Sequence, residues 1–248
     1  MKKKITAIFL CVALVAIAVV GASLAYFTDK TETVENVFTL GNVKIAIREV
    51  FDTDDAVLVP GKDVNKDVFV KNTGSQPAYV RVHIAIPSAV DDGNPSFAAI
   101  NNFLHFNFTN ESVADGQWSW IPTMTTGNGY RGNGSGNWNF YTETVDDVAY
   151  NVYVVTYRTA LAAGNETTTA ALDKVYLDKS VDAAQNDDGS ITYKDNKGNE
   201  VTFTDAASLK ILVKAEGVQT DGFTDAYDAL NKAFGTPGSE GYVSPFKK

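Results

Sequence analysis

The stretch Ala78–Pro87 reads AYVRVHIAIP and decides the fold class. Every second residue in its middle is β-branched and apolar, which places four side chains on one side of an extended chain: Val80, Val82, Ile84 and Ile86. Tyr79, Arg81 and His83 fall on the other side. Alternation with a period of two is typical of a strand that buries one face. The stretch therefore predicts a β-strand within a sheet.

Similar short runs of apolar and β-branched residues predict further strands on both sides of this one. The expected strands are 42–50, 66–72, 118–121, 139–144, 148–158, 174–177, 191–193, 201–203 and 208–218. Turn formers separate several of them, for example Pro60-Gly61 and residues 195–199. The run 148–158 is apolar on both faces, as in a central strand. The last strand directs four side chains inward: Leu209, Ile211, Val213 and Ala215.

Helical spacing is confined to two short segments. Residues 95–103 carry apolar side chains at helical intervals, and 224–234 predicts an amphipathic helix with the stripe Phe223, Tyr227, Leu230 and Phe234. Thr224 is the expected N-cap, with Asp225 in the first turn. About ten short strands with two or three helices predict a mainly β, single-domain sandwich.

The N-terminus has the pattern of an export signal. Lys2, Lys3 and Lys4 precede the apolar run Ile5–Val20, and the small residues Ser23 and Ala25 suit positions −3 and −1 of a cleavage site before Tyr26. An uncleaved anchor is the alternative, because a bilayer needs roughly 17–25 residues. The sequence thus predicts a secreted protein that contacts the membrane only through an uncleaved signal.

Charge and cysteine content exclude several classes of function. The formal net charge is −9, and it becomes −12 when the three lysines of the signal are removed. Such an acidic chain does not favour nucleic acid as a partner. The single cysteine, Cys11, lies inside the signal, so the mature chain has neither a disulfide nor a thiol nucleophile.

Catalytic and metal-binding patterns are weak. Only His83 and His105 are present, and neither a His-Glu-x-x-His nor a Gly-x-Ser-x-Gly motif occurs. Both histidines are expected to be structural or surface residues, with a histidine–carboxylate metal site left open as the alternative. We therefore expect no catalytic residue, no cofactor and no enzymatic activity.

Three loops carry further candidate sites. Residues 184–195 resemble part of an EF-hand, but the twelfth position is Asp195 instead of glutamate, so an acidic turn is expected. The acidic loop Asp52, Asp54 and Asp55 is expected to be solvated, with loose binding of a hard cation as the alternative. Around the Gly-rich loop 125–137, four aromatic residues could form a carbohydrate platform, with two of the tryptophans expected in the core: Trp118, Trp120, Tyr130 and Trp138.

The segment between signal and first strand is unusual for a free chain end. It carries apolar residues among Thr, Asp and Glu: Tyr26, Phe27, Val34, Val37 and Phe38. Strand pairing would bury them, either within the same subunit or in a neighbouring one. A head-to-tail contact between neighbours does not close, and it therefore generates a filament.

Several motifs in residues 1–87 resemble the TasA/camelysin family of biofilm-matrix and cell-surface proteins. They are LAYFTD at 24–29, NVFTLGNVKI at 36–45, VPGK at 59–62 and VKNTGS at 70–75. The resemblance implies a jelly-roll sandwich, export with a dedicated signal peptidase, and fibres in which Tyr26–Val37 of one subunit completes the sheet of the next. Some family members carry a metallopeptidase label, but no motif here supports that activity.

Together these patterns predict a signal peptide at 1–25, an assembly strand segment at 26–41 and a jelly-roll domain at 42–248. The expected function is a secreted structural subunit of matrix or cell-surface fibres, with other copies of itself and possible accessory subunits as partners. A monomeric adhesin that binds carbohydrate or protein is the alternative. A secreted metallopeptidase using His83 and His105 is the third hypothesis.

Overall fold

The computed structural model of the protein describes residues 42–51, 58–91, 103–106, 118–119, 140–203 and 209–247. This part of the chain is mainly β, with antiparallel sheets and one short helix, which confirms the predicted fold class. The jelly-roll order of strands stays a prediction. The expected signal, the assembly segment and the loop at 125–137 lie outside the described residues, as do residues 95–102 of the expected helical segment 95–103.

The first sheet has four strands in the order β1-β2-β8-β4. They are β1 (Ile45–Phe51), β2 (Val64–Asn72), β8 (Leu172–Leu177) and β4 (Leu104–Phe106). All neighbouring pairs are antiparallel. Strand β1 therefore forms one edge of this sheet.

The second sheet has the order β12-β3-β7-β5, and β6 also pairs with β7. Its strands are β12 (Leu212–Gln219), β3 (Ala78–Pro87), β7 (Val148–Tyr157), β5 (Trp118–Ser119) and β6 (Phe140–Val145). Strand β12 forms one edge here, and the predicted central strand β7 is flanked on both sides.

A third, smaller sheet consists of β9 (Asp182–Gln185), β10 (Ile191–Lys194) and β11 (Glu200–Phe203). The turn at 195–199 between β10 and β11 was expected. The sequence does not predict β9, because its residues are all exposed and show no apolar alternation. Its pairing with β10 is what makes it a strand.

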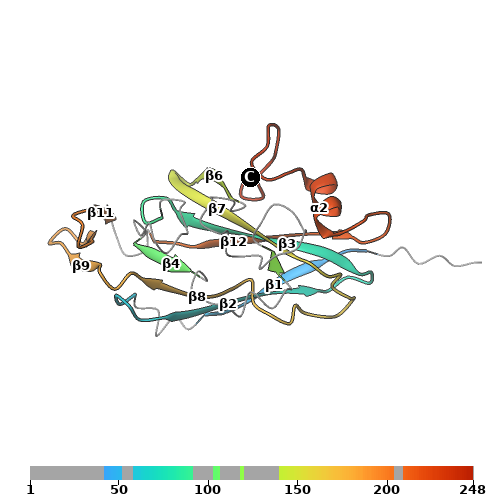
Figure 1. Ribbon diagram of the computed structural model, residues 1–248, viewed down its shortest axis with the longest axis horizontal. Helices are drawn as coiled ribbons and strands as arrows, with labels where there is room; N and C mark the ends of the chain where they lie inside the picture. Colours follow the sequence, from blue (N-terminus) through green and yellow to red (C-terminus); the bar gives the residue numbers. More distant parts are fainter. Residues whose placement is uncertain are drawn as a thin grey trace, which may run out of the picture. The chain divides into compact units, whose positions relative to one another are not determined.

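The core lies between the first two sheets, which Figure 1 shows as stacked layers. The predicted inner face of β3 is confirmed, because Val80, Val82, Ile84 and Ile86 are fully buried. The outer face of β3 is also buried, which the sequence does not predict. Helix α2 (Ala226–Phe234) and the C-terminal segment cover that outer face (Figure 1).

Several element boundaries differ from the expectation, and two of the differences have a clear physical cause. Asp225, not Thr224, is the N-cap of α2, because the Asp225 side chain accepts a hydrogen bond from the Asp228 backbone N–H. Strand β12 begins at Leu212 instead of 208. In its register with β3, Lys210 would face Pro87, which has no backbone N–H to donate.

Candidate functional site

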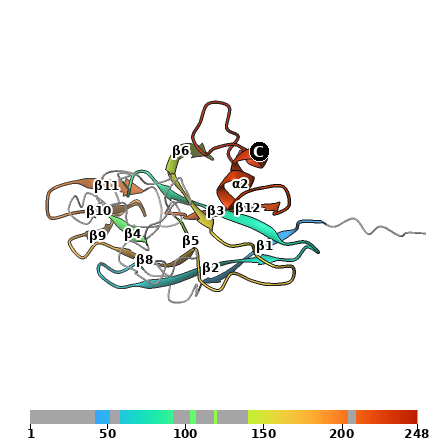
Figure 2. The same cartoon turned by 45° about the vertical axis from the view of Figure 1, so that its right-hand side comes forward.

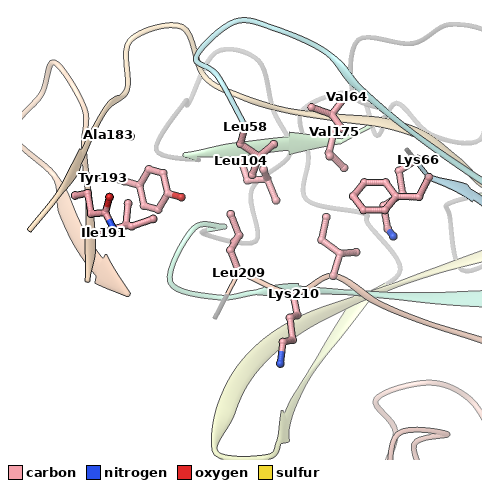
Figure 3. Close-up of a pocket in the computed structure, with 13 residues that line it drawn as sticks. Leu58, Val64, Lys66, Leu104, Val175, Ala183, Ile191, Tyr193, Leu209 and Lys210 are labelled. Atoms are coloured by element: carbon pink, nitrogen blue, oxygen red, sulfur yellow. The ribbon is translucent and has the colours of Figure 1, made fainter. Parts of the chain in front are cut away.

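An apolar groove of about 620 Å³ opens at one end of the sandwich (Figure 3). The first sheet supplies one wall, in which Val64, Leu104 and Val175 come from three different strands. These side chains belong to the inner faces of their strands. The wall is therefore a continuation of the core, and its side chains are almost fully buried.

The opposite walls come from the third sheet and from the segment that leads into β12. Ile191 and Tyr193 of β10 line one side, and Leu209 and Ile211 line another. Leu104 and Leu209 point toward one another across the groove (Figure 3). Since Leu209 and Ile211 are only half-buried, their apolar surface remains available to a further segment of chain.

A buried lysine stands at the inner rim of the groove. Lys66 lies in the inward row of β2 and is only 8 % exposed. Its ammonium forms an ion pair with Glu49 of β1 and lies 4.7 Å from the centroid of the Phe51 ring. The pair places charge on the inner side of the β1 edge, where the other inward residues of β1 are apolar.

A partly open seam runs from the groove between the two edge strands, and we define it as β1 with residues 211–217. Ile45 and Ile47 border it on one side, and Val213 and Ala215 on the other. All four side chains are half-buried against the core. The seam is therefore an apolar strip between two sheet edges.

The chain enters the sandwich at the end of β1 that is far from the groove. The backbone N–H groups of Thr73 and Gly74 donate to the Lys44 carbonyl, and Ser75 N–H donates to the Asn42 carbonyl. Phe51 at the other end of β1 lines the groove. Seven strand residues at about 3.3 Å each separate the two ends by roughly 20 Å.

A second site, a buried polar cluster, lies on the outer face of the five-stranded sheet under the C-terminal segment. The Arg81 guanidinium donates to Glu216 Oε2 at 2.5 Å, to Asn231 Oδ1 at 3.1 Å and to the Gly235 carbonyl at 3.1 Å. Arg81 is 2 % exposed. It therefore ties β3, β12 and the end of α2 together from inside.

His83 belongs to the same cluster. Its Nε2 lies 3.0 Å from Glu216 Oε2, and its Nδ1 lies 3.4 Å from the Tyr141 hydroxyl, which contacts Ser244 Oγ at 3.0 Å. Burial lowers the pKa of His83 in spite of the nearby carboxylate. Burial acts to raise the pKa of Glu216, but the hydrogen bonds and charges of His83 and Arg81 outweigh it and lower that pKa.

The two histidines do not come together. His83 lies on β3 of the five-stranded sheet, whereas His105 lies on β4 of the other sheet and contacts Asp178 Oδ2 at 3.0 Å. Within the described ranges, no group of three or more His, Cys, Asp or Glu side chains is arranged to hold a metal ion. The Arg81 guanidinium on Glu216 also disfavours a second cation beside His83.

The other candidate residues have structural roles where they are described. Asp188 Oδ1 accepts hydrogen bonds from the backbone and hydroxyl of Ser190, so this segment is the expected acidic turn before a strand. Trp118 is fully buried, and its indole N–H donates to the Thr169 carbonyl, as expected for a core tryptophan. Trp120, Tyr130 and Trp138 lie outside the described residues.

The predicted processing and assembly residues are also outside the described part. They are Ser23, Ala25 and Tyr26 for cleavage, and Tyr26, Phe27, Val34, Val37 and Phe38 for assembly. Sequence reasoning missed the groove and the cluster around Glu216. One signal was available for the groove: Lys66 interrupts the apolar phase of Val64, Val68 and Val70.

Comparison with known families finds one family match, which covers the N-terminal part of the chain. Residues 1–108 match the family described as camelysin metallo-endopeptidase. No curated protein matches the chain. Within the described ranges, the residues do not fit the metal centre that this description implies. No described helix is long and apolar enough to cross a membrane. The matched region contains the motifs at 24–29, 36–45, 59–62 and 70–75, so the family match covers the same residues that resemble the TasA/camelysin family.

Proposed function

We propose that the protein is a secreted structural subunit of matrix or cell-surface fibres. In this proposal Tyr26–Val37 of one subunit is a donor strand that occupies the groove and seam of the next subunit. The match of residues 1–108 to a family identified with surface and matrix proteins supports export and a role outside the cell.

One observation carries the proposal. The chain enters the sandwich beside Asn42, and the apolar groove lies at the other end of β1, beside Phe51. A segment that precedes residue 42 therefore starts at the end opposite to the site that would receive it. When identical subunits repeat in one orientation, donor and acceptor ends meet, and the contact propagates without closing.

Length and charge favour this occupant. Sixteen residues, 26–41, span up to about 50 Å when extended, which exceeds the roughly 20 Å of β1. Among the described residues that line the groove, only Lys66 and Lys210 are charged. The donor segment carries three acidic residues and one lysine, so its net charge is opposite to that of Lys210, whereas Lys66 is already paired with Glu49. Its aromatic and valine side chains match the apolar lining.

The proposal assigns the chain no catalytic activity. In the described ranges each histidine is paired with a carboxylate that has other partners as well: Arg81 for Glu216 and Ser180 for Asp178. Incubation of the mature protein with casein is expected to give no cleavage that a chelator suppresses. Chelator-sensitive cleavage would contradict the non-enzymatic assignment.

Electron microscopy of the chain that begins at Tyr26 tests the proposal. We expect fibres from this chain and none from a chain that lacks 26–37. Val34→Asp is expected to reduce fibre formation strongly, because it puts a charge at an apolar donor position. Thr33→Asp is the matched control, since it adds the same charge at a polar position. Equal polymerisation of the truncated chain would refute the donor-strand mechanism.

A further inference from the structure

Both edge strands of the sandwich leave backbone groups without partners in the described part of the chain. The Lys44 carbonyl accepts hydrogen bonds from the N–H groups of Thr73 and Gly74, which directly follow β2. Backbone groups alternate in direction along a strand, so the N–H and C=O groups of Ala46 and Arg48 also point toward β2. The corresponding groups of Ile45 and Ile47 point away from β2. Strand β1 is therefore one free edge.

The same reasoning gives the phase of β12. Ser88 N–H donates to the Ala149 carbonyl, so the even-numbered residues of β3 face β7 and the odd-numbered residues face β12. In register, Lys214 and Glu216 then bond to β3. The backbone groups of Val213 and Ala215 point outward, and they form the second free edge.

The side chains of the two edges differ in charge. Behind the free edge of β12, Val213 and Ala215 are apolar and pack against the core, while Lys214 and Glu216 lie on the outer face. On β1, Glu49 lies on the inner side and pairs with Lys66. Inward-pointing charge is a common device against strand addition at an edge. The β1 edge therefore carries an inward charge that disfavours the addition of another strand, and the inward residues Val213 and Ala215 of the β12 edge carry none.

The seam is closed at one end. A Cβ atom at Gly217 would lie 2.9 Å from Ile45 Cγ2, so β1 and β12 are in close contact there. At the other end, Phe51 and Ile211 both line the groove. A strand from a neighbour must therefore enter at the groove and run toward Gly217.

This entry route fixes the direction of the donor strand. Its residues near Val37, closest to the neighbour's body, lie at the groove, and its residues near Tyr26 lie toward Gly217. The donor then runs antiparallel to β12 and parallel to β1. Every strand pair in the described sheets is antiparallel, the more favourable arrangement per residue.

We propose that the donor segment of a second copy pairs antiparallel with the free edge of β12 and extends the five-stranded sheet. The inference rests on the proposed fibre function and adds the acceptor strand and the direction. The donor's inward side chains then cover Ile47 and Val213 across the seam, and the Ala215 N–H gains a partner.

Cysteine cross-linking tests the acceptor strand, because the only native cysteine lies in the signal. Single donor cysteines at positions 28–36 are combined with Lys214→Cys on β12 or, as the matched control, Ala46→Cys on β1. Both acceptor positions are exposed. With Lys214→Cys we expect most of the protein to appear as disulfide-linked oligomers on a non-reducing gel. With Ala46→Cys we expect only a minor fraction in such oligomers. The opposite result would overturn the assignment to β12.

A second pair of acceptor positions tests the direction. Lys210→Cys lies just before β12 at the groove, and Lys214→Cys lies further along the strand, before the closed end at Gly217. Lys210→Cys is expected to link to a donor cysteine at Asn36, and Lys214→Cys to one at Glu32. The reverse pairing would overturn the antiparallel direction but would leave the fibre proposal intact.

A proline substitution provides an independent readout. Ala215→Pro removes an N–H that points outward, so the ladder to β3 stays complete and the subunit should fold. We expect the variant to raise the critical concentration for fibres at least tenfold. Unchanged assembly by a folded Ala215→Pro would overturn the inference. Absence of fibres from the cysteine-free parent would instead overturn the proposed function, and this inference with it.

Discussion

The two sides of strand β12 differ in how completely they are covered. On its outer face, Glu216 is held by Arg81 and His83, and α2 with the C-terminal segment covers all three. Along its edge and at the groove, Val213 and Leu209 remain half-buried. Figure 2 shows α2 and the C-terminus over the sheet, with the third sheet at the other end. One side is complete within the subunit, and the other is suited to a further strand.

The largest expected effect is the loss of stability when the buried Arg81 guanidinium is removed from the covered outer face. Arg81→Met leaves the buried Glu216 without its cation and removes the guanidinium donor of the Gly235 carbonyl, so we expect a loss of about 3–5 kcal/mol in the free energy of unfolding. Urea unfolding of a chain without residues 26–37 measures it. Arg48→Met is the control, because the Arg48–Glu166 pair is exposed. Equal losses in both variants would contradict the assigned role of the cluster.

The covered side should also make stability depend on pH. Burial lowers the pKa of His83, so the unfolded chain binds its proton more readily than the folded chain. The stability contributed by neutral His83 is complete above the ordinary histidine pKa of about 6.5, and it is lost as the pH falls through the lower folded pKa. Unfolding midpoints at pH 7, 6 and 5 measure the slope. His83→Gln should flatten it, and an unchanged slope would show that another group is responsible.

The open side should tolerate truncation better. Leu209 is half-buried, so Leu209→Ala is expected to cost about 1 kcal/mol in the monomer. Leu104→Ala is the matched control across the groove, where full burial predicts a loss of about 2–5 kcal/mol. Urea unfolding of the two variants measures both losses. Equal costs would mean that Leu209 belongs to the closed core and that the groove is not an open site.

The smallest expected effect is a gain in stability at the β6–β7 turn, on the covered side. Asp146 and Asp147 connect the two strands with φ values of 47° and 65°. Positive φ is unfavourable for residues other than glycine, so Asp147→Gly should stabilise the fold by about 0.5–1 kcal/mol. Thermal unfolding measures the change. A loss of stability would mean that the Asp147 side chain has a role beyond the turn.

Much of the architecture follows from short-range sequence patterns. The alternation of Val80, Val82 and Ile84 identifies a strand and its buried face, because side chains alternate with a period of two along any strand. The helix near 224–234 follows from apolar spacing. Its cap does not, because Thr224 and Asp225 are both suitable residues and only the chain geometry selects Asp225.

The sites are less predictable because distant segments build them. The burial of Arg81 depends on Glu216 and Gly235, which are more than 130 residues away in the sequence. The groove combines the ends of strands from two sheets with a segment that no ladder holds. Strand β9 has no apolar pattern of its own and depends on β10. Local periodicity carries no information about such contacts.

Binding of the isolated donor strand tests the central claim most directly. A synthetic peptide of residues 26–37 is titrated into a chain that starts at residue 38, and the heat of binding is measured by calorimetry. The account predicts saturable binding of one peptide per subunit, weakened by Ala215→Pro in the subunit and absent for a scrambled peptide. No binding, or equal binding of the scrambled peptide, would contradict it.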